Sequence, residues 1–117
     1  MSDCARIIEW AGGTHTFDLG HPWIAKVLSF RGFPGSGGSS PAACLARFEN
    51  QNYTADDIEA VIRLGLIGGG MDEAAAQAVI INHVYGKPLG PLAIIAFEVL
   101  GALFVGKPDA ISTDEAA

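Results

Sequence analysis

The stretch PLAIIAFEVLGALFVG, residues Pro91–Gly106, constrains the fold more than any other part of the sequence. Glu98 is its single charged residue, and the residues three and four positions from Glu98 are isoleucine, glycine and alanine. A helix built from this stretch has no polar side, so it must lie at the centre of the fold or be covered by another molecule. We expect part of it to form an interface with another polypeptide. The alternative is a core helix that the chain itself covers completely, with Glu98 at its edge.

The chain is small for the task of covering such a helix. It has 117 residues, which is the size of one domain. Hydrophobic residues make up 50% of the sequence and charged residues 17%, a composition that favours a packed fold over a disordered chain. The net charge is −6 and the basic residues are scattered singly, so we expect no nucleic acid partner. We expect no membrane partner either, because the apolar stretch is shorter than the roughly 20 residues that span a bilayer.

Residues 6–19 carry the pattern of a β-hairpin, with Gly12 and Gly13 between two short runs rich in Ile, Trp, Thr and Phe. A two-residue turn at these glycines pairs Trp10 with His15 and Ile8 with Phe17. Alternation along the strands then gives the hairpin one dry face, which consists of Ile8, Trp10, His15, Phe17 and Leu19. An isolated two-stranded hairpin is marginally stable in water, so this face must lie on helices or on another chain.

Residues 22–106 predict a bundle of about five short helices. The expected helices start at Pro22, after the cap Ser40, after the cap Thr54 with Asp57 as the acid of a capping box, near Asp72, and at Leu89 or Pro91. The segment 32–40 is rich in Gly and Ser and predicts a mobile loop. Residues 107–117 predict a frayed acidic tail. The expected fold is therefore α+β, mostly α, with a single domain over residues 1–106.

Three consecutive glycines, Gly68, Gly69 and Gly70, stand before the fourth predicted helix. Backbone amides of a glycine-rich loop can cradle a phosphate, but such a loop follows a strand and is followed by Lys and Ser or Thr. Here a helix precedes the glycines, and the acids Asp72 and Glu73 follow them. We therefore interpret the glycines as a joint that lets the chain reverse sharply between two helices.

The histidines do not have the spacing of a metal site. His15, His21 and His83 form no HxH or HxxxH pair. His15 belongs to the predicted hairpin, His21 stands at a helix start, and His83 lies in a last helical turn, where the helix dipole favours a cation. We interpret all three as structural residues, and we expect no metal and no cofactor.

The cysteines and the paired acids do not form a recognisable catalytic group either. Cys44 has no base beside it in the sequence, so we interpret it as a small core residue. We expect Cys4 and Cys44 to be free thiols. The pairs Asp56–Asp57 and Asp72–Glu73 stand at predicted helix starts, which attract negative charge. The chain is therefore not expected to be an enzyme.

The order of these elements resembles a known family. A hairpin with GGTHTFDLG is followed by a short helix, by LARFENQNYTADDIEAVIRLGLIGGGMDEAAAQAVIINHV and by PLGPLAIIAFEVLGALFVG. From about Ile8 to Gly106 this is similar to the small tail protein of alphaproteobacterial gene transfer agents and related prophages. The most specific part of the resemblance is LGLIGGG at Leu64–Gly70. The segment FPGSGGSSP departs from the family by being longer and richer in glycine.

That family is described both as a tail tube protein and as a tail assembly chaperone, and the two functions make different demands. Tube subunits of long-tailed phages are mainly β, whereas the strand pattern here covers about fifteen residues. The resemblance therefore implies a chaperone that binds the tape-measure protein and helps recruit the tail tube protein in the cytoplasm of the bacterial host. The alternatives are a structural tail tube or connector subunit, and a small cytoplasmic helical adaptor unrelated to virions.

We expect a homo-oligomer whose partner-binding residues lie on the last helix and on the dry face of the hairpin. These residues are Ile8, Trp10, Phe17, Leu92, Ile95, Phe97, Val99 and Leu103. They are large apolar side chains of the two elements that have more apolar surface than a short chain can bury.

Overall fold

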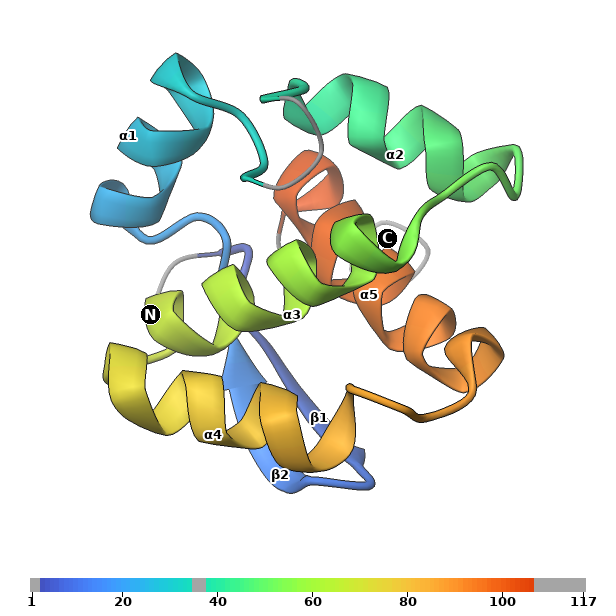
Figure 1. Cartoon of the computed structure of the whole chain (residues 1–117). Coiled ribbons are helices and arrows are strands. Elements are labelled where there is room, and N and C mark those ends of the chain that lie inside the picture. Colours follow the sequence, from blue (N-terminus) through green and yellow to red (C-terminus); the bar gives the residue numbers. More distant parts are fainter. Residues whose placement is uncertain (1–2, 35–37, 107–117) are drawn as a thin grey trace, which may run out of the picture.

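The computed structural model describes residues 3–34 and 38–106, and in them a two-stranded hairpin is followed by a set of helices (Figure 1). The elements are β1 (Arg6–Trp10), β2 (Gly13–Phe17), α1 (Pro22–Phe30), α2 (Pro41–Glu49), α3 (Ala55–Gly68), α4 (Glu73–His83) and α5 (Leu89–Val105). The prediction of an α+β, mostly α fold is confirmed. The predicted tail over residues 107–117, and residues 35–37 of the predicted loop, lie outside the described residues.

Helix α3 is the central element of the fold. It contacts α1, α4, α5 and β2, and Figure 1 shows it crossing the middle of the molecule with α5 behind it. Its predicted start is confirmed, because the Thr54 hydroxyl accepts a hydrogen bond from the N–H of Asp57 and the Asp57 carboxylate accepts one from the N–H of Thr54. This capping box satisfies N–H groups that the start of a helix leaves without helical partners.

The core lies between α3 and the elements around it. Its largest fully buried side chains come from the hairpin, the loops and several helices, and they include Phe17, Leu19, Ile24, Phe33, Ile58, Ile62, Leu66, Ile80 and Leu100. Burying a side chain of this size contributes roughly 1.5 to 3 kcal/mol relative to leaving it exposed. Because α3 supplies three of these side chains, Ile58, Ile62 and Leu66, the rest of the fold is organised around it.

The hairpin has the predicted faces but not the predicted register. Trp10 pairs with Gly13, so the turn lies one residue earlier than predicted, and His15 faces Ile8. The predicted pairs of Trp10 with His15 and of Ile8 with Phe17 are wrong, since each partner is displaced by two residues. Side chains alternate with a period of two, so this shift leaves every side chain on its predicted face. The apolar pattern is therefore unable to distinguish the two registers.

The predicted loop over residues 32–40 contains a core residue that the sequence pattern did not reveal. Phe33 is fully buried, and its N–H donates a hydrogen bond of 2.9 Å to the carbonyl oxygen of Ser39. Gly32 has a φ of 70°, and a Cβ at this position would lie 2.1 Å from the same carbonyl oxygen. Only glycine fits so close an approach. The hydrogen bond from Phe33 to Ser39 thus joins the two described ends of the loop, and the Phe33 ring is buried in the core.

Candidate functional site

One side of α5 is apolar and is not covered by the chain. We call it the α5 outer face, and it consists of Ile94, Phe97, Gly101, Phe104 and Val105. The four large side chains are 69%, 43%, 50% and 59% exposed in that order. Their spacing of three and four residues places them on one stripe of the helix. A contiguous exposed apolar stripe is typical of surfaces that bind another molecule.

The opposite side of α5 belongs to the core. Its buried residues are Leu92, Ala93, Ala96, Val99, Leu100 and Ala102, and α5 packs against α3 and α2. The helix therefore has an inner and an outer face, although its composition is apolar on both. The sequence shows that the helix has surplus apolar surface, but it does not show which side the chain covers.

A groove of about 300 Å³ continues the α5 outer face toward the end of α2. It is lined by Phe48, Gln51, Tyr53, Gly90, Ala93, Ile94 and Phe97. The rings of Phe48 and Tyr53 are stacked, with centroids 5.1 Å apart and planes inclined by 16°. They form an aromatic wall against which an apolar side chain of a partner can pack.

Glu98 is the single charged residue of α5, and it is exposed at one edge of the outer face. A repeat of 3.6 residues per turn places Glu98 on one side of Ile94 and places Phe97 and Phe104 on the other side. The outer face therefore has an aromatic edge and an acidic edge. A helix that packs on this face meets both edges at once.

The predicted partner-binding residues fall into three groups. Ile8, Phe17, Leu92 and Val99 are buried in the core, Trp10, Ile95 and Leu103 are half-buried against it, and Phe97 is exposed on the α5 outer face. The buried residues are covered by the chain itself in this structure, and their contact with a partner stays a prediction. Ile94, Phe104 and Val105 were missed, because an all-apolar helix offers no polar side from which its exposed residues could be located.

Much of the dry face of the hairpin is covered from within the chain. The Trp10 ring packs edge-on against Phe17 and against His83 of α4, with centroids 6.0 and 6.2 Å away. The indole N–H of Trp10 donates a hydrogen bond of 2.8 Å to Nδ1 of His15. His15 and His83 thus lie beside the same ring, whereas His21 stands at the start of α1. These contacts give the three histidines the structural roles that were predicted for them.

The predicted glycine joint is the place where α3 passes closest to the hairpin strand β2. A Cβ at Gly68 would lie 1.8 Å from the carbonyl oxygen of Asp18, and one at Gly69 would lie 2.0 Å from that of Thr16. Gly70 has a φ of 115°, a conformation that favours glycine and lets the chain turn toward α4. Gly70 therefore has the role predicted for the joint. Gly68 and Gly69 are needed for another reason, the close approach of two backbones.

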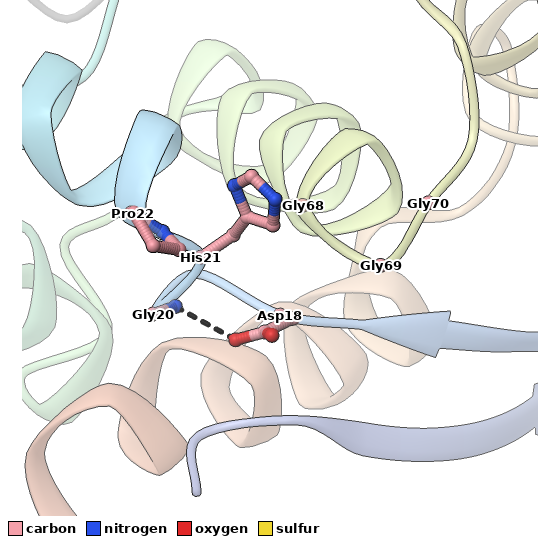
Figure 2. Close-up of a pocket in the computed structure, with 7 residues that line it drawn as sticks. All are labelled: Asp18, Gly20, His21, Pro22, Gly68, Gly69 and Gly70. Carbon is pink, nitrogen blue, oxygen red and sulfur yellow. Dashed lines mark hydrogen bonds between the residues drawn. The ribbon is translucent and has the colours of Figure 1, made fainter. Parts of the chain in front are cut away.

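A hollow of about 520 Å³ lies beside this joint and is lined by Asp18, Gly20, His21, Pro22 and Gly68–Gly70 (Figure 2). The buried Asp18 carboxylate accepts a hydrogen bond of 2.9 Å from the N–H of Gly20, and Nδ1 of His21 accepts one of 3.2 Å from the first turn of α1. In Figure 2 the Asp18 carboxylate lies toward Gly20 and the His21 ring lies beside Gly68. Both act as local caps of the backbone.

The strongest polar contact joins α2 to α3. Arg47 donates two hydrogen bonds to the carboxylate of Asp57, from Nε at 2.8 Å and from Nη2 at 2.7 Å. Nη2 also donates to the hydroxyl of Ser39 at 2.8 Å, and the hydrogen bond to Asp57 raises the pKa of Arg47. The Asp57 side chain is fully buried, so the guanidinium neutralises a charge that water does not reach. The contact is a structural clamp between two helices.

Cys44 lies next to this clamp. Burial, reinforced by the negative charge of Asp57, raises the pKa of the Cys44 thiol from 9.0 to about 12. A thiol of this kind stays protonated at neutral pH and is a poor nucleophile. Cys44 is fully buried, which confirms the prediction of a small core residue, and Cys4 and Cys44 are not joined by a disulfide.

The fold and its surface define a class of protein. Within residues 3–34 and 38–106, no cluster of His, Cys, Asp or Glu is placed to hold a metal ion. In the same part of the chain, no helix combines the length and the hydropathy needed to cross a bilayer. Helix α5 carries an uncovered apolar face with an adjoining groove. A surface of this kind is typical of small helical proteins that bind other polypeptides.

Comparison with known families makes the identification specific. The chain belongs to the family described as "Phage tail tube protein, GTA-gp10", which matches residues 4–106. The predicted resemblance to a tail protein of phages and gene transfer agents is confirmed at this level. No curated protein and no solved structure matches the chain. The family description names a structural tail component.

Proposed function

We propose that this tail protein is an assembly chaperone that holds helical segments of the tape-measure protein on the α5 outer face and helps recruit tail tube subunits. The observation that carries the proposal is the uncovered apolar stripe of α5, whose residues Ile94, Phe97, Phe104 and Val105 are each between 43% and 69% exposed. A net charge of −6 on the same small chain keeps a complex with an apolar client soluble. The protein acts in the host cytoplasm, where tails assemble.

The shape of the surface favours a helical client. The outer face is a stripe along a helix of 17 residues, which corresponds to a length of about 25 Å. An amphipathic helix that lies along such a stripe buries apolar residues at every third or fourth position. The groove beside Phe48 and Tyr53 accepts one of its larger side chains. A basic residue of the client opposite Glu98 adds electrostatic selectivity.

A second candidate function is that of a structural ring subunit of the tail tube. The family description names a tube protein, and a ring needs two different surfaces that meet head to tail. The exposed Trp23 and Phe30 on α1 supply a second apolar surface, at 51% and 81% exposure. Against this candidate, the described residues contain a single two-stranded sheet, which does not supply the β-structure from which long-tailed phage tubes are built.

The chaperone function is tested by titrating the full chain with peptides that cover the predicted helices of the tape-measure protein from its own gene cluster. We expect at least one peptide to bind, and the double variant Phe97→Ser/Phe104→Ser to weaken binding more than about tenfold, which corresponds to 1.4 kcal/mol. Phe30→Ser removes a more exposed ring, 81% exposed, from α1 and is expected to leave binding unchanged. Lack of binding by any segment contradicts the proposal.

Purified particles separate the two candidate functions. A chaperone leaves the finished tail, so mass spectrometry of particles finds the chain absent or in trace amounts. Retention at the same copy number as the tube rings contradicts the chaperone proposal and supports the structural one. The chain must be present in the producing cells at the time of assembly for this comparison to be made.

A further inference from the structure

We infer that the α5 outer face also pairs with the same face of a second copy of this chain, antiparallel and about a twofold axis near Gly101. The free protein then covers its own apolar stripe until a client displaces the second copy. The pairing depends on the features of α5 alone, so it can be tested independently of the chaperone function. The molecule that covers the α5 outer face in the free protein is a second copy of this chain.

The first observation is the glycine in the middle of the stripe. Gly101 lies between Phe97 and Phe104, and a Cβ built on it would meet no atom within 4 Å. Glycine in a helix interior is less stable than alanine, and here no contact within the described chain requires it. A small residue at this place lets a second helix approach closely, with large side chains on either side of the crossing point.

The second observation is that the stripe is complementary to itself. Phe97 and Phe104 lie on the same edge of the outer face, four and three residues from Gly101. In an antiparallel pair whose twofold axis is perpendicular to both helices, equivalent edges meet. The axis near Gly101 therefore brings Phe97 of one copy beside Phe104 of the other, and the reverse contact forms at the same time. One surface patch thus satisfies both halves of the interface.

The charge and the size of the surface set the strength of the pairing. Glu98 lies on the other edge, so the same axis brings two carboxylates to one side of the interface, between two chains of net charge −6 each. A face about 25 Å long also lies at the small end of stable interfaces. We therefore expect a dissociation constant on the order of 10 μM that becomes lower as salt screens the repulsion.

The pairing is tested by sedimentation of the full chain from about 1 to about 200 μM, a range that brackets the expected dissociation constant. Wild type is expected to pass from monomer to dimer. The sharpest variant is Gly101→Leu, which adds apolar surface but blocks the close approach, so we expect at least tenfold weaker dimerisation with an intact fold. Glu98→Gln removes the repulsion and is expected to tighten the dimer, whereas a basic client would lose affinity for the same variant.

The matched control is Ile81→Ser, which removes a 53% exposed apolar side chain from α4 and is expected to leave the dimer unchanged. Gly101→Cys, in a Cys4→Ser background, is expected to form a disulfide between copies under mild oxidation, because equivalent residues near a twofold axis come within bonding reach. Phe30→Cys in the same background is expected to form none.

Three results overturn the pairing: a monomer at every concentration, a tighter dimer for Gly101→Leu, or association that Ile81→Ser abolishes equally. The chaperone proposal survives each of them if the client peptide still binds. Conversely, a dimer that forms as described, in a chain that binds no client segment, supports the pairing and contradicts the chaperone function.

Discussion

Helices α3 and α5 are both rich in apolar residues and pack against each other, but the rest of the chain covers α3 on most sides and α5 on only some. α3 begins with a capping box, contacts α1, α4, α5 and β2, and buries most of its residues. α5 begins at Pro88 with no side-chain cap, and a whole stripe of it is exposed. The difference shows that the hydropathy of a helix does not decide whether it is a core element. The number of sides that its neighbours cover decides it.

The largest expected difference in unfolding free energy is between a glycine-to-alanine substitution in α3 and the same substitution in α5. Gly68→Ala in α3 places a methyl group 1.8 Å from the carbonyl oxygen of Asp18, so we expect it to cost more than about 4 kcal/mol or to prevent folding. Gly101→Ala in α5 meets no atom within 4 Å and is expected to stabilise the fold by about 0.5 to 1 kcal/mol. Urea denaturation measures both. Equal effects would contradict the different coverage of the two helices.

The next effect concerns the clamp that fixes the start of α3. Arg47→Met removes the cation from the fully buried carboxylate of Asp57, and we expect a loss of about 3 kcal/mol of unfolding free energy. Replacing both residues, with Arg47→Met and Asp57→Asn, removes the uncompensated charge and is expected to restore part of the loss. Thermal denaturation of the single and double variants measures the coupling. A single variant as stable as wild type would show that the pair is not a clamp.

A smaller effect follows from the buried thiol beside the clamp. The Cys44 thiol titrates near 12 in the folded chain and near 9.0 when unfolded, so unfolding releases a proton as pH rises above 9.0. This pKa is raised by folding, so the thiol does not oppose folding below pH 9.0, and stability is lost between 9.0 and about 12. We expect Cys44→Ala to show a shallower loss over this range, measured by denaturation as a function of pH. The same slope in both proteins would contradict the assignment.

The smallest effect on stability is expected on the α5 outer face. Phe97→Ser removes a ring that is 43% exposed, and Phe104→Ser one that is 50% exposed, so each loses only the packing of the covered half of its ring and is expected to lower the unfolding free energy by about 1 to 2 kcal/mol. Their effect on association is expected to be large. Chemical denaturation at low protein concentration separates the two quantities. A loss of several kcal/mol in the monomer would mean that the rings belong to the core.

The structural features that the sequence predicted correctly depend on residues a few positions apart or on a regular apolar repeat. The capping box of Thr54 and Asp57, the start of α1 at Pro22 and the two faces of the hairpin follow from spacing within a few residues. The register of the hairpin does not, because registers that differ by two residues give the same faces. The contact of Arg47 with Asp57 joins two helices across a separation of ten residues, and no local pattern indicates it.

The candidate site was predicted in kind but not residue by residue. The excess of apolar surface on α5 is visible in its composition, whereas the exposed stripe depends on which sides α2 and α3 cover. Phe33 shows the reverse error, since a glycine-rich and serine-rich segment hides a fully buried ring. In both cases the missing information is a tertiary contact. It is set by elements distant in the sequence.

The measurement that tests the central claim most directly is hydroxyl-radical footprinting of the full chain, read out residue by residue by mass spectrometry. Phe97 and Phe104 report on the α5 outer face, and the 81% exposed Phe30 is the internal reference. The chain is labelled when dilute, when concentrated and when bound to a tape-measure segment. We expect the oxidation of Phe97 and Phe104 to fall in the last two states while that of Phe30 stays constant. Unchanged oxidation of Phe97 and Phe104 in both states would contradict the central claim.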